Sequence, residues 1–410
     1  MIRSRIVPIF ILGNSSRIAV KDRIVSKLAT EPDHPPDGNR NFSFTSGNRE
    51  LITRGLMEPI DAPAADGHEA DSRFCKIVGH ALDRARLAGQ DNPILVGAIP
   101  FDPKQASCLY VPEQYEWRRL PEASHAATAV QPELLSQNNV PDEHSFKQAV
   151  EKTISNFRPN NVLKAVLSVQ RKLTFTRNVD LPAMRDSLVA QNPSGYFFHV
   201  PLPDGSTLIG VSPELLVSKQ GPTFICNPLA GSARRLADPR ADQENADWLS
   251  ASEKNQYEHR LVTADIANQL DGWCNWLRVP EQPSLIRTDT LWHLSTRIEG
   301  ELSDPRTTAL QLACRLHPTP AVCGFPTEPA RRLIRSVEPF ERGLFTGMVG
   351  WCDAAGNGEW VVTIRCGTVR GNHMQLFAGA GIVEASDPAS EWAEVQTKLG
   401  TMLRACGLPH

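Results

Sequence analysis

The sequence predicts an α+β fold in which large antiparallel β-sheets, sandwich-like in arrangement, pack against helices. Alternating apolar strands follow one another across short turns such as "PDG" (203–205) and "GNG" (356–358), which is typical of antiparallel hairpins. Helical patterns occur in separate blocks rather than after every strand, so a doubly wound parallel sheet is not expected. Neither G-x-G-x-x-G after a strand nor G-x-x-x-x-G-K-[ST] occurs, which argues against a dinucleotide or P-loop site.

The elements of the first half can be assigned in order. Residues 31–72 are rich in Pro, Asp and Gly, and we expect loops there around one short strand at 41–46. The elements expected next are a strand at 93–102, a helix at 145–157 behind the N-cap Ser145, a half-buried strand at 162–170, two strands within 196–219 joined by the "PDG" turn, and a strand at 222–235 that opens into a glycine loop.

The second half repeats this pattern. One long helical span is expected over 241–270, and alternating strands over 344–383 are separated by the turns "GNG" and "GN". A helix at 387–403 ends the pattern.

Composition limits the function classes. The 410 residues, 41% of them apolar, can bury a sizeable core. A formal net charge of −3 with interspersed signs offers no basic stripe, so nucleic acid is not an expected partner. Nine scattered cysteines without a C-x-x-C pair suggest reduced thiols in a cytoplasmic protein. No uncharged stretch of about 18 residues is present, so no membrane partner is expected. The apolar run that follows the basic start is short and carries a proline, unlike a secretory signal.

The last predicted helix carries an unusual set of charges. Glu391, Glu394 and Lys398 lie at i, i+3 and i+7, so they share one stripe beside the apolar Val395 and Leu399. Two adjacent carboxylates at the border of a core require a cation or a proton between them. The alternative is an exposed helix start, where first-turn acids complement the helix dipole. The stripe alone leaves both interpretations open.

Three further residues suggest chemistry. Glu258 lies near an apolar face of the 241–270 helical span, and together with Glu391 and Glu394 it could provide the oxygen ligands that Mg²⁺ prefers. Lys164 lies within a predicted strand, where a buried lysine must find a partner or lose its charge, and a neutral lysine can act as a general base. Glu214 also lies among apolar residues of a predicted strand pair, so if it is buried it too must find a partner or lose its charge. The alternative for both is a solvent-facing side chain.

Two other residues have the character of ligand contacts. Arg365 lies in the middle of a predicted strand, and its planar guanidinium is suited to binding a carboxylate, although a cross-strand salt bridge would also account for it. His293, in "LWHLST", fits a core histidine as well as a catalytic one.

Several long blocks of the sequence carry a resemblance to known enzymes. They are "PLAGSARR", "ASEKNQYEHRLV", "LWHLSTRIEG", "LHPTPAVCGFP", "RGLFTGMVGWCDAAGNGEWVVTIRCGTVRGNHMQLFAGAGIV" and "EWAEVQTKLGTML". These blocks resemble the chorismate-utilising enzymes, and most closely the isochorismate synthases of siderophore pathways. The resemblance covers residues 42–410 as a single catalytic domain, and it leaves residues 1–41 as a poorly structured extension.

The resemblance implies a role for each candidate residue in converting chorismate to isochorismate. Acids at the positions of Glu258, Glu391 and Glu394 would surround a Mg²⁺ that holds the ring carboxylate, with Lys398 close by. Lys164 would activate the water that attacks ring carbon C2, and Glu214 would protonate the departing C4 hydroxyl. The positions that the resemblance places around the substrate are Arg365 at the enolpyruvyl carboxylate, the backbone of Gly231, Ser232 and Gly379, and the pocket residues His293, Ala321 and Phe345.

Particular positions separate the relatives from one another. Family members that aminate through a lysine carry it where this chain has Ala230, and salicylate synthases tend to have threonine at the position of Ala321, so the resemblance favours a water-adding enzyme that stops at isochorismate. Val169 and Asn255 depart from the usual arginine and acid without removing a catalytic group. The alternatives are a salicylate synthase and a non-catalytic relative. We expect a monomer.

Overall fold

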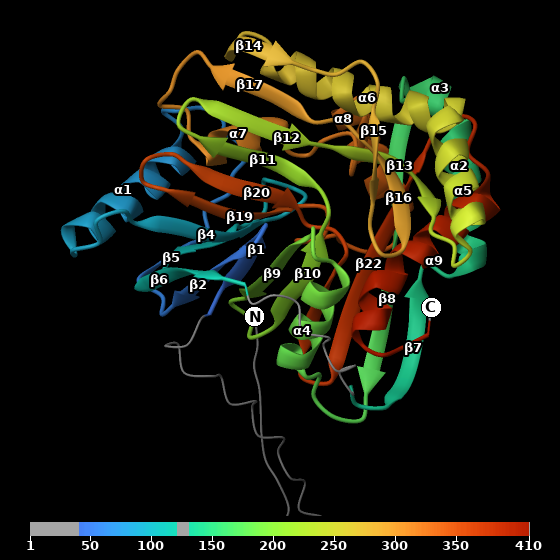
Figure 1. Cartoon of the computed structure of the whole chain (residues 1–410), viewed down its shortest axis with the longest axis horizontal. Helices are drawn as coiled ribbons and strands as arrows, with labels where there is room; N and C mark the ends of the chain where they lie inside the picture. The colour runs from blue at the N-terminus through green and yellow to red at the C-terminus, as the bar shows by residue number, and fades with distance from the viewer. Residues whose placement is uncertain (1–40, 121–130, 410) are drawn as a thin grey trace, which may run out of the picture. The chain divides into compact units, whose positions relative to one another are not determined.

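The computed structural model describes residues 41–120 and 131–409, which belong to one compact unit. Apart from its last residue, the predicted extension at 1–41 lies outside the described residues. Within the described ranges the chain forms two large sheets and one small sheet, and every strand pairing is antiparallel (Figure 1). The predicted α+β class is therefore confirmed.

The strands fall into three sheets. In the ten-stranded sheet the order is β18 (Gly324–Phe325), β8 (Lys164–Phe175), β22 (His373–Ile382), β21 (Cys366–Arg370), β10 (Thr207–Ser212), β9 (Tyr196–Pro201), β1 (Ser43–Ser46), β2 (Arg49–Arg54) and β6 (Gln114–Arg119), with β7 (Leu134–Val140) also paired to β8. In the nine-stranded sheet it is β14 (Cys274–Arg278), β17 (Ile298–Leu302), β12 (Thr223–Asn227), β11 (Leu215–Gln220), β20 (Gly358–Val362), β19 (Met348–Asp353), β4 (Ile94–Ile99), β5 (Cys108–Val111) and β3 (Glu58–Ile60). The three-stranded sheet has the order β13 (Leu229–Arg234), β16 (Leu291–Ser295) and β15 (Ser284–Arg287).

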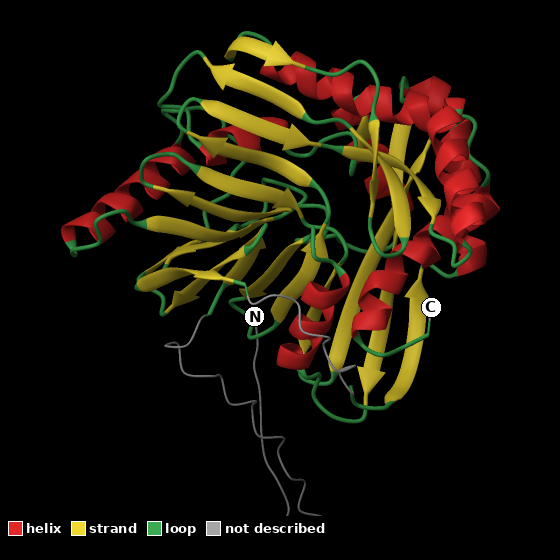
Figure 2. Cartoon of the chain, viewed as in Figure 1, coloured by secondary structure: helices red, strands yellow, loops and turns green. Residues whose placement is uncertain are grey.

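The helices lie beside the sheets (Figure 2). They are α1 (Arg73–Leu87), α2 (Glu143–Ser155), α3 (Phe157–Asn160), α4 (Leu181–Gln191), α5 (Pro239–Ala251), α6 (Glu253–Leu270), α7 (Ala309–Leu316), α8 (Thr327–Val337) and α9 (Pro388–Ala405). Helices α2, α4, α8 and α9 share one apolar core with the ten-stranded sheet, and α1, α6 and α7 share another with the nine-stranded sheet. No helix among the residues described is long and apolar enough to cross a bilayer.

A third core lies between the two large sheets and makes them a sandwich. It joins Phe44 and Phe198 of the ten-stranded sheet to Val96 and Val349 of the nine-stranded sheet, all of them buried. Burial of this apolar area on both inner faces supplies the main driving force for sheet packing.

The chain passes directly between the two large sheets at four points, from β2 to β3, β5 to β6, β10 to β11 and β20 to β21, and the last two crossings carry functional candidates. The chain leaves β10 in the ten-stranded sheet and enters β11 in the nine-stranded sheet, with Glu214 at the crossing. It returns between β20 and β21, with Arg365 at that crossing. These two crossings are hydrogen-bonded to their neighbours: Val362 N donates to Glu214 O at 3.1 Å, and Val211 N donates to Arg365 O at 3.1 Å. Both functional candidates are thus fixed where the sheets join.

The structure corrects three strand predictions. Residues 41–60 form three strands rather than one, because the "GN" at 47–48 closes a hairpin between β1 and β2. Strand β8 is buried on both faces from Lys164 to Gln170 instead of being half-buried. Ala165, Leu167 and Val169 pack in the core with the helices, and Lys164 and Val166 lie at the cavity wall on the other face. The expected glycine loop after β12 is strand β13, in which Gly231, with φ +79°, lies at an irregularity in the pairing with β16.

Two helix predictions were also wrong in detail. The cap of α2 is Asp142, whose Oδ1 accepts a hydrogen bond from Ser145 N at 2.8 Å, and not Ser145 itself. The span at 241–270 is two helices, because Ser252 leaves the helical conformation and caps α6 with its side chain. This break determines the direction in which α6 presents Glu258.

Candidate active site

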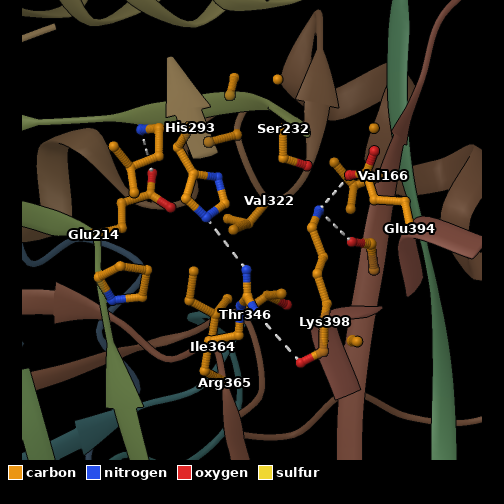
Figure 3. Close-up of a pocket in the computed structure, with 18 of the residues that line it drawn as sticks. Val166, Glu214, Ser232, His293, Val322, Thr346, Ile364, Arg365, Glu394 and Lys398 are labelled. Carbon is orange, nitrogen blue, oxygen red and sulfur yellow. Dashed lines mark hydrogen bonds and ion pairs between the residues drawn. The ribbon is translucent and has the colours of Figure 1, made fainter. Parts of the chain in front are cut away.

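A cavity lies where the three sheets meet, and most of the predicted site residues line it (Figure 3). Its wall includes the predicted residues Glu214, Gly231, Ser232, Glu258, His293, Ala321, Phe345, Arg365, Gly379, Glu394 and Lys398. The other two, Lys164 and Glu391, do not line it. These residues come from segments spread over about half of the chain, and the sheet pairings bring them together.

Lys164 lies directly behind the cavity wall, at the start of β8. Its side chain is fully buried, and its Nζ is 3.0 Å from Oε1 of Glu258, which lines the cavity. Among the described residues the ammonium has this ion pair but no acceptor in hydrogen-bond geometry. The interpretation of Lys164 as a solvent-facing residue is therefore wrong. Burial with unused donor capacity suits a group that contacts a water or a substrate.

Gly381 on β22 makes room for this ion pair. A Cβ at position 381 would come within 2.1 Å of Oε1 of Glu258 and 3.0 Å of Cε of Lys164. A side chain at position 381 would therefore force Glu258, Lys164 or both to move from the positions in which they pair.

Glu214 is buried at its crossing, and its carboxylate points into the cavity (Figure 3). Its Oε1 accepts a 3.4 Å hydrogen bond from the backbone N of Leu229. Burial raises the pKa of Glu214 to about 7, although that hydrogen bond and the positive charges of Lys164 and Lys398 oppose the change. The carboxyl can hold a proton near neutral pH, as a general acid requires.

Arg365 is fully enclosed and adopts an unusual backbone conformation, with φ +49°. Its guanidinium donates to Oγ1 of Thr401 at 3.1 Å and lies 3.4 Å from Nε2 of His293. Burial lowers the pKa of Arg365 to about 10, which leaves it positively charged at neutral pH. Burial, with Arg365 and Lys398 nearby, lowers the pKa of His293 well below its usual value, so His293 is a neutral partner. The prediction that Arg365 lies within a strand was wrong, because the residue forms the turn between two sheets.

Helix α9 directs its charged stripe toward the opposite wall. Nζ of Lys398 is 2.6 Å from Oε1 of Glu394 and donates to the backbone O of Gly379 at 2.8 Å (Figure 3). Burial acts to raise the pKa of Glu394, but the positive charges of Lys398 and Lys254 outweigh it and lower this pKa. Both side chains line the cavity, so the interpretation of this stripe as a solvated helix start is wrong for them.

Glu391 lies one turn earlier on α9 and faces a neighbouring cleft. The cleft is bounded by α5, α6 and α9 and shares Ser232 and Glu394 with the cavity. Glu391 is buried, and its Oε1 is 2.6 Å from Nζ of Lys254. Burial and the negative charge of Glu394 raise the pKa of Glu391. Lys254 is a residue that sequence reasoning missed, although its i, i+4 spacing from Glu258 on α6 placed the two on one helix face.

The three acids proposed as metal ligands fit Mg²⁺ by their chemistry. Carboxylate oxygens are its preferred protein ligands. Burial, and after it the negative charge of Glu394, raises the pKa of Glu391, and a cation between these two acids would offset both effects. In the arrangement seen, however, each acid is paired with a lysine, and no group of three metal-binding side chains within the described ranges is close enough to hold an ion. Binding would require Glu258, Glu391 and Glu394 to exchange lysine partners for the metal.

The positions that distinguish relatives are also placed. Ala230 and Ala321 both line the cavity, and neither brings a polar group into it. Asn255 is buried beside Gly231 and its Nδ2 donates to Oγ of Ser252 at 2.9 Å, while Val169 is fully buried in the core under the helices. These departures therefore lie outside the cavity wall.

Further cavity residues were not predicted from the sequence. They are Val166, Pro213, Leu229, Val322, Thr346, Ile364, Phe377, Ala378 and Gly381. Most are apolar and differ in no visible way from core residues elsewhere in the chain, so the sequence offers no signal for them. Thr346 is an exception in conformation, with φ +58°, which is strained for a β-branched residue.

Comparison with known proteins identifies the family. A family model described as chorismate binding enzyme matches residues 76–407. The chain belongs to this family. It is 45% identical over 371 residues to isochorismate synthase EntC of Escherichia coli strain K12, covering 90% of this chain and 95% of that protein. It is 43% identical over 376 residues to isochorismate synthase DhbC of Bacillus subtilis strain 168, with coverage of 90% and 94%.

A solved structure agrees with this placement in the chorismate-binding family. The structure described as a putative 2,3-dihydroxybenzoate-specific isochorismate synthase, DhbC from Bacillus anthracis, is similar with a TM-score of 0.85 and 39% identity. The match covers 92% of this chain and 98% of that one. The predicted family is confirmed by sequence and by fold.

Proposed function

We propose that this protein is an isochorismate synthase that converts chorismate to isochorismate. The observation that carries the proposal is the presence of a buried acid, Glu214, whose pKa burial raises to about 7, in the wall of the same cavity behind which the buried Lys164 lies. Relatives with this name match nearly the whole chain. Arg365 and Lys398 supply the positive charge that a dicarboxylate substrate needs.

The reaction can be assigned to these residues step by step. Lys164, as a neutral amine released from its ion pair with Glu258, accepts a proton from a water as the water oxygen bonds to ring carbon C2. The ring double bonds shift, and the C4–O bond breaks. Glu214 donates its proton to the departing hydroxyl, which leaves as water, so the product is an isomer of the substrate. Arg365 holds the enolpyruvyl carboxylate, and the backbone of Gly231 and Gly379 limits how the ring can lie.

We propose Mg²⁺ as the cofactor, held by Glu258, Glu391 and Glu394. When bound, it would neutralise the ring carboxylate and fix its position. The acids of α9 and α6 would then release Lys398, Lys254 and Lys164 toward substrate and water. We expect Glu394→Gln to raise the Mg²⁺ concentration needed for half-maximal turnover by about tenfold or more. Glu253→Gln, in the exposed first turn of α6, is the control. An unchanged Mg²⁺ requirement in Glu394→Gln would remove that residue from the metal site.

We also propose a pathway and a cellular compartment for the reaction. The similar solved structure from Bacillus anthracis is described as specific for 2,3-dihydroxybenzoate, which supports a role in making a dihydroxybenzoate or salicylate siderophore. The buried thiols Cys226, Cys352 and Cys366, whose pKa values are raised by burial, suit a reducing cytoplasm. Light scattering on the purified protein would test the expected monomer.

The deciding experiment is incubation of the purified protein with chorismate, with and without Mg²⁺, followed by chromatography of the products. We expect isochorismate only when Mg²⁺ is present. Salicylate together with pyruvate would instead indicate a salicylate synthase, an outcome that the apolar Ala321 in the cavity wall disfavours. Absence of any product with any metal would indicate a non-catalytic relative.

A further inference from the structure

A buried ion pair outside the cavity ties together three segments of its wall. Glu338 follows the end of α8, and Arg342 lies four residues later, with side-chain exposures of 4% and 3%. Nε and Nη2 of Arg342 donate to the two carboxylate oxygens of Glu338 at 2.8 and 2.6 Å. A bidentate pair of this kind has a fixed geometry.

The pair takes the place of a missing strand beside β8. On this edge β18 pairs with β8 as far as Ala165, the backbone N of Val166 donates to Cys323 O at 2.9 Å, and pairing with β7 begins only at Gln170. In the gap, Nη2 of Arg342 donates to Val166 O at 2.7 Å, and Ser168 N donates to Glu338 Oε1 at 2.8 Å. The ion pair thus satisfies the backbone groups that a strand would otherwise satisfy.

The same guanidinium reaches the other wall of the cavity. Nη1 of Arg342 donates to Val322 O at 2.9 Å and to Oγ1 of Thr346 at 3.2 Å. Its Cζ lies 4.5 Å from the ring centre of Phe101 and 5.9 Å from that of Phe345. Thr346 is the residue held at φ +58°, so this contact helps to maintain a strained conformation at the cavity.

One side chain therefore sets the spacing of parts that are far apart in the chain. Val166, Val322, Phe345 and Thr346 all line the cavity, and Val166 is two residues from Lys164 on the same strand. A loss of this spacing would move the base relative to the ring of the substrate, and displacements of about 1 Å can lower a rate by about a hundredfold.

We infer that Arg342, oriented by Glu338, is a positioning residue that holds the strand carrying Lys164 in register with the cavity wall formed by Val322 and Phe345. This inference rests on the proposed isochorismate synthase function. Arg342 does not line the cavity, and its hydrogen bonds do not reach the proposed Mg²⁺ ligands Glu258, Glu391 and Glu394. It therefore acts through the backbone groups that it binds, Val166 O and Val322 O.

The test separates positioning from charge balance. Removing one partner of a buried ion pair leaves an unpaired charge and destabilises the fold, whereas removing both relieves that cost. We expect Arg342→Met to lower both the melting temperature and kcat, and the double variant Arg342→Met with Glu338→Met to recover only part of the melting temperature, because Val166 O, Val322 O and Ser168 N remain without partners. Its kcat should stay about tenfold or more below wild type, with KM for chorismate changed by less than about threefold, because the bonds to Val166 O and Val322 O are still missing.

Other variants complete the design. Arg335→Met, which removes an exposed ion pair with Asp102 near the end of α8, should leave kcat unchanged. Arg342→Lys keeps a charge for Glu338 but cannot reach both carbonyl oxygens at once, so it should fold and turn over slowly. A double variant that regains kcat together with the melting temperature, or a folded Arg342→Lys with wild-type kcat, would overturn the inference.

Hydrogen exchange separates this inference from the proposed function. The backbone amide of Ser168 should exchange faster in the double variant than in Arg335→Met. If the wild-type protein does not turn over chorismate, the proposed function fails, and exchange at Ser168 still decides whether the ion pair orders β8. Equal exchange in the two variants would contradict the positioning role.

Discussion

Lys164 lies where a charged side chain is costly, because its ammonium is fully enclosed and has one ionic partner, Glu258. Such a pair contributes little to stability compared with well-packed apolar residues, so its presence in β8 points to use rather than to structural need. The residue also lies at the first position of the strand, next to the cavity wall. We therefore explain the burial of Lys164 in β8 by its proposed role as a base and not by a contribution to packing.

At the scale of single residues, we expect Lys164→Ala to lower kcat by about a hundredfold or more, because no side chain then accepts the proton of the attacking water. Mg²⁺ should still bind, since Glu258 gains a free carboxylate. Steady-state kinetics and titration calorimetry with Mg²⁺ measure the two effects. The control is Lys172→Ala on the same strand, where the side chain is exposed. Retained turnover in the Lys164 variant would refute the base role.

Glu214 gives a prediction for pH. Because burial raises its pKa to about 7, kcat should fall as pH rises above about 7 and the acid loses its proton. The folded protein also binds this proton more tightly than the unfolded chain does. Its contribution to stability is therefore complete below about pH 4.5, the usual value, and is lost as pH rises through about 7.

The variant Glu214→Gln tests the stability half of this prediction. It should be nearly inactive, and its melting temperature relative to wild type should be higher at about pH 8 than at about pH 5, because the buried negative charge is absent. Scanning calorimetry of both proteins at both pH values measures the difference. The same difference at the two pH values would mean that Glu214 has an ordinary pKa.

At the scale of elements, β22 and α9 act as one unit. Helix α9 begins behind the cap Asp387, whose side chain accepts from Ser390 N at 2.8 Å, and this start sets the rotation that aims Glu394 and Lys398 at the cavity. Strand β22 contributes the backbone against which Lys398 donates, at Gly379. The directions of Glu394 and Lys398 therefore depend on where α9 begins and on its contact with β22.

Two glycines in different elements should respond in opposite ways to the same change. Gly381→Ala on β22 places a methyl group against Glu258 and Lys164, so we expect lower stability and strongly reduced kcat. Gly79→Ala in α1 meets no atom within 4 Å, so it should stabilise the protein by about 0.5–1 kcal/mol without changing kcat. Urea unfolding and kinetics measure both. Equal effects would show that the space around Gly381 has no role.

At the scale of the whole molecule, the sequence predicted whether a segment is a helix or a strand better than it predicted which sheet a strand joins. The hairpins at 344–383 and the helix at 387–403 follow from local turn residues and periodicity, and both are confirmed. The break at Ser252 was missed because its capping is a local competition that a continuous helical pattern conceals. The crossing at Arg365 was missed because no residue near it signals a change of sheet.

The site was predicted by resemblance more than by physics. Spacing alone grouped Glu391, Glu394 and Lys398, which share a helix, but it could not bring them to Glu214 or Arg365. Those meetings depend on pairings between strands more than a hundred residues apart, such as β10 with β21. Periodicity describes only a short window of chain, so it contains no information about them.

Because the chain crosses repeatedly between the large sheets, each sheet is built from both halves of the sequence, and this affects how the protein loses activity. A cut in the exposed turn at 203–205 would leave β1–β9 on one fragment and β10–β22 on the other, so each large sheet would be divided between them. The first fragment would carry Lys164 and the second would carry Glu214 and Arg365. Neither fragment alone would hold all the proposed catalytic residues, and because the two large sheets share one core we expect them to unfold together. Turnover is therefore a direct gauge of the intact population, and its loss should accompany melting of the shared core rather than precede it.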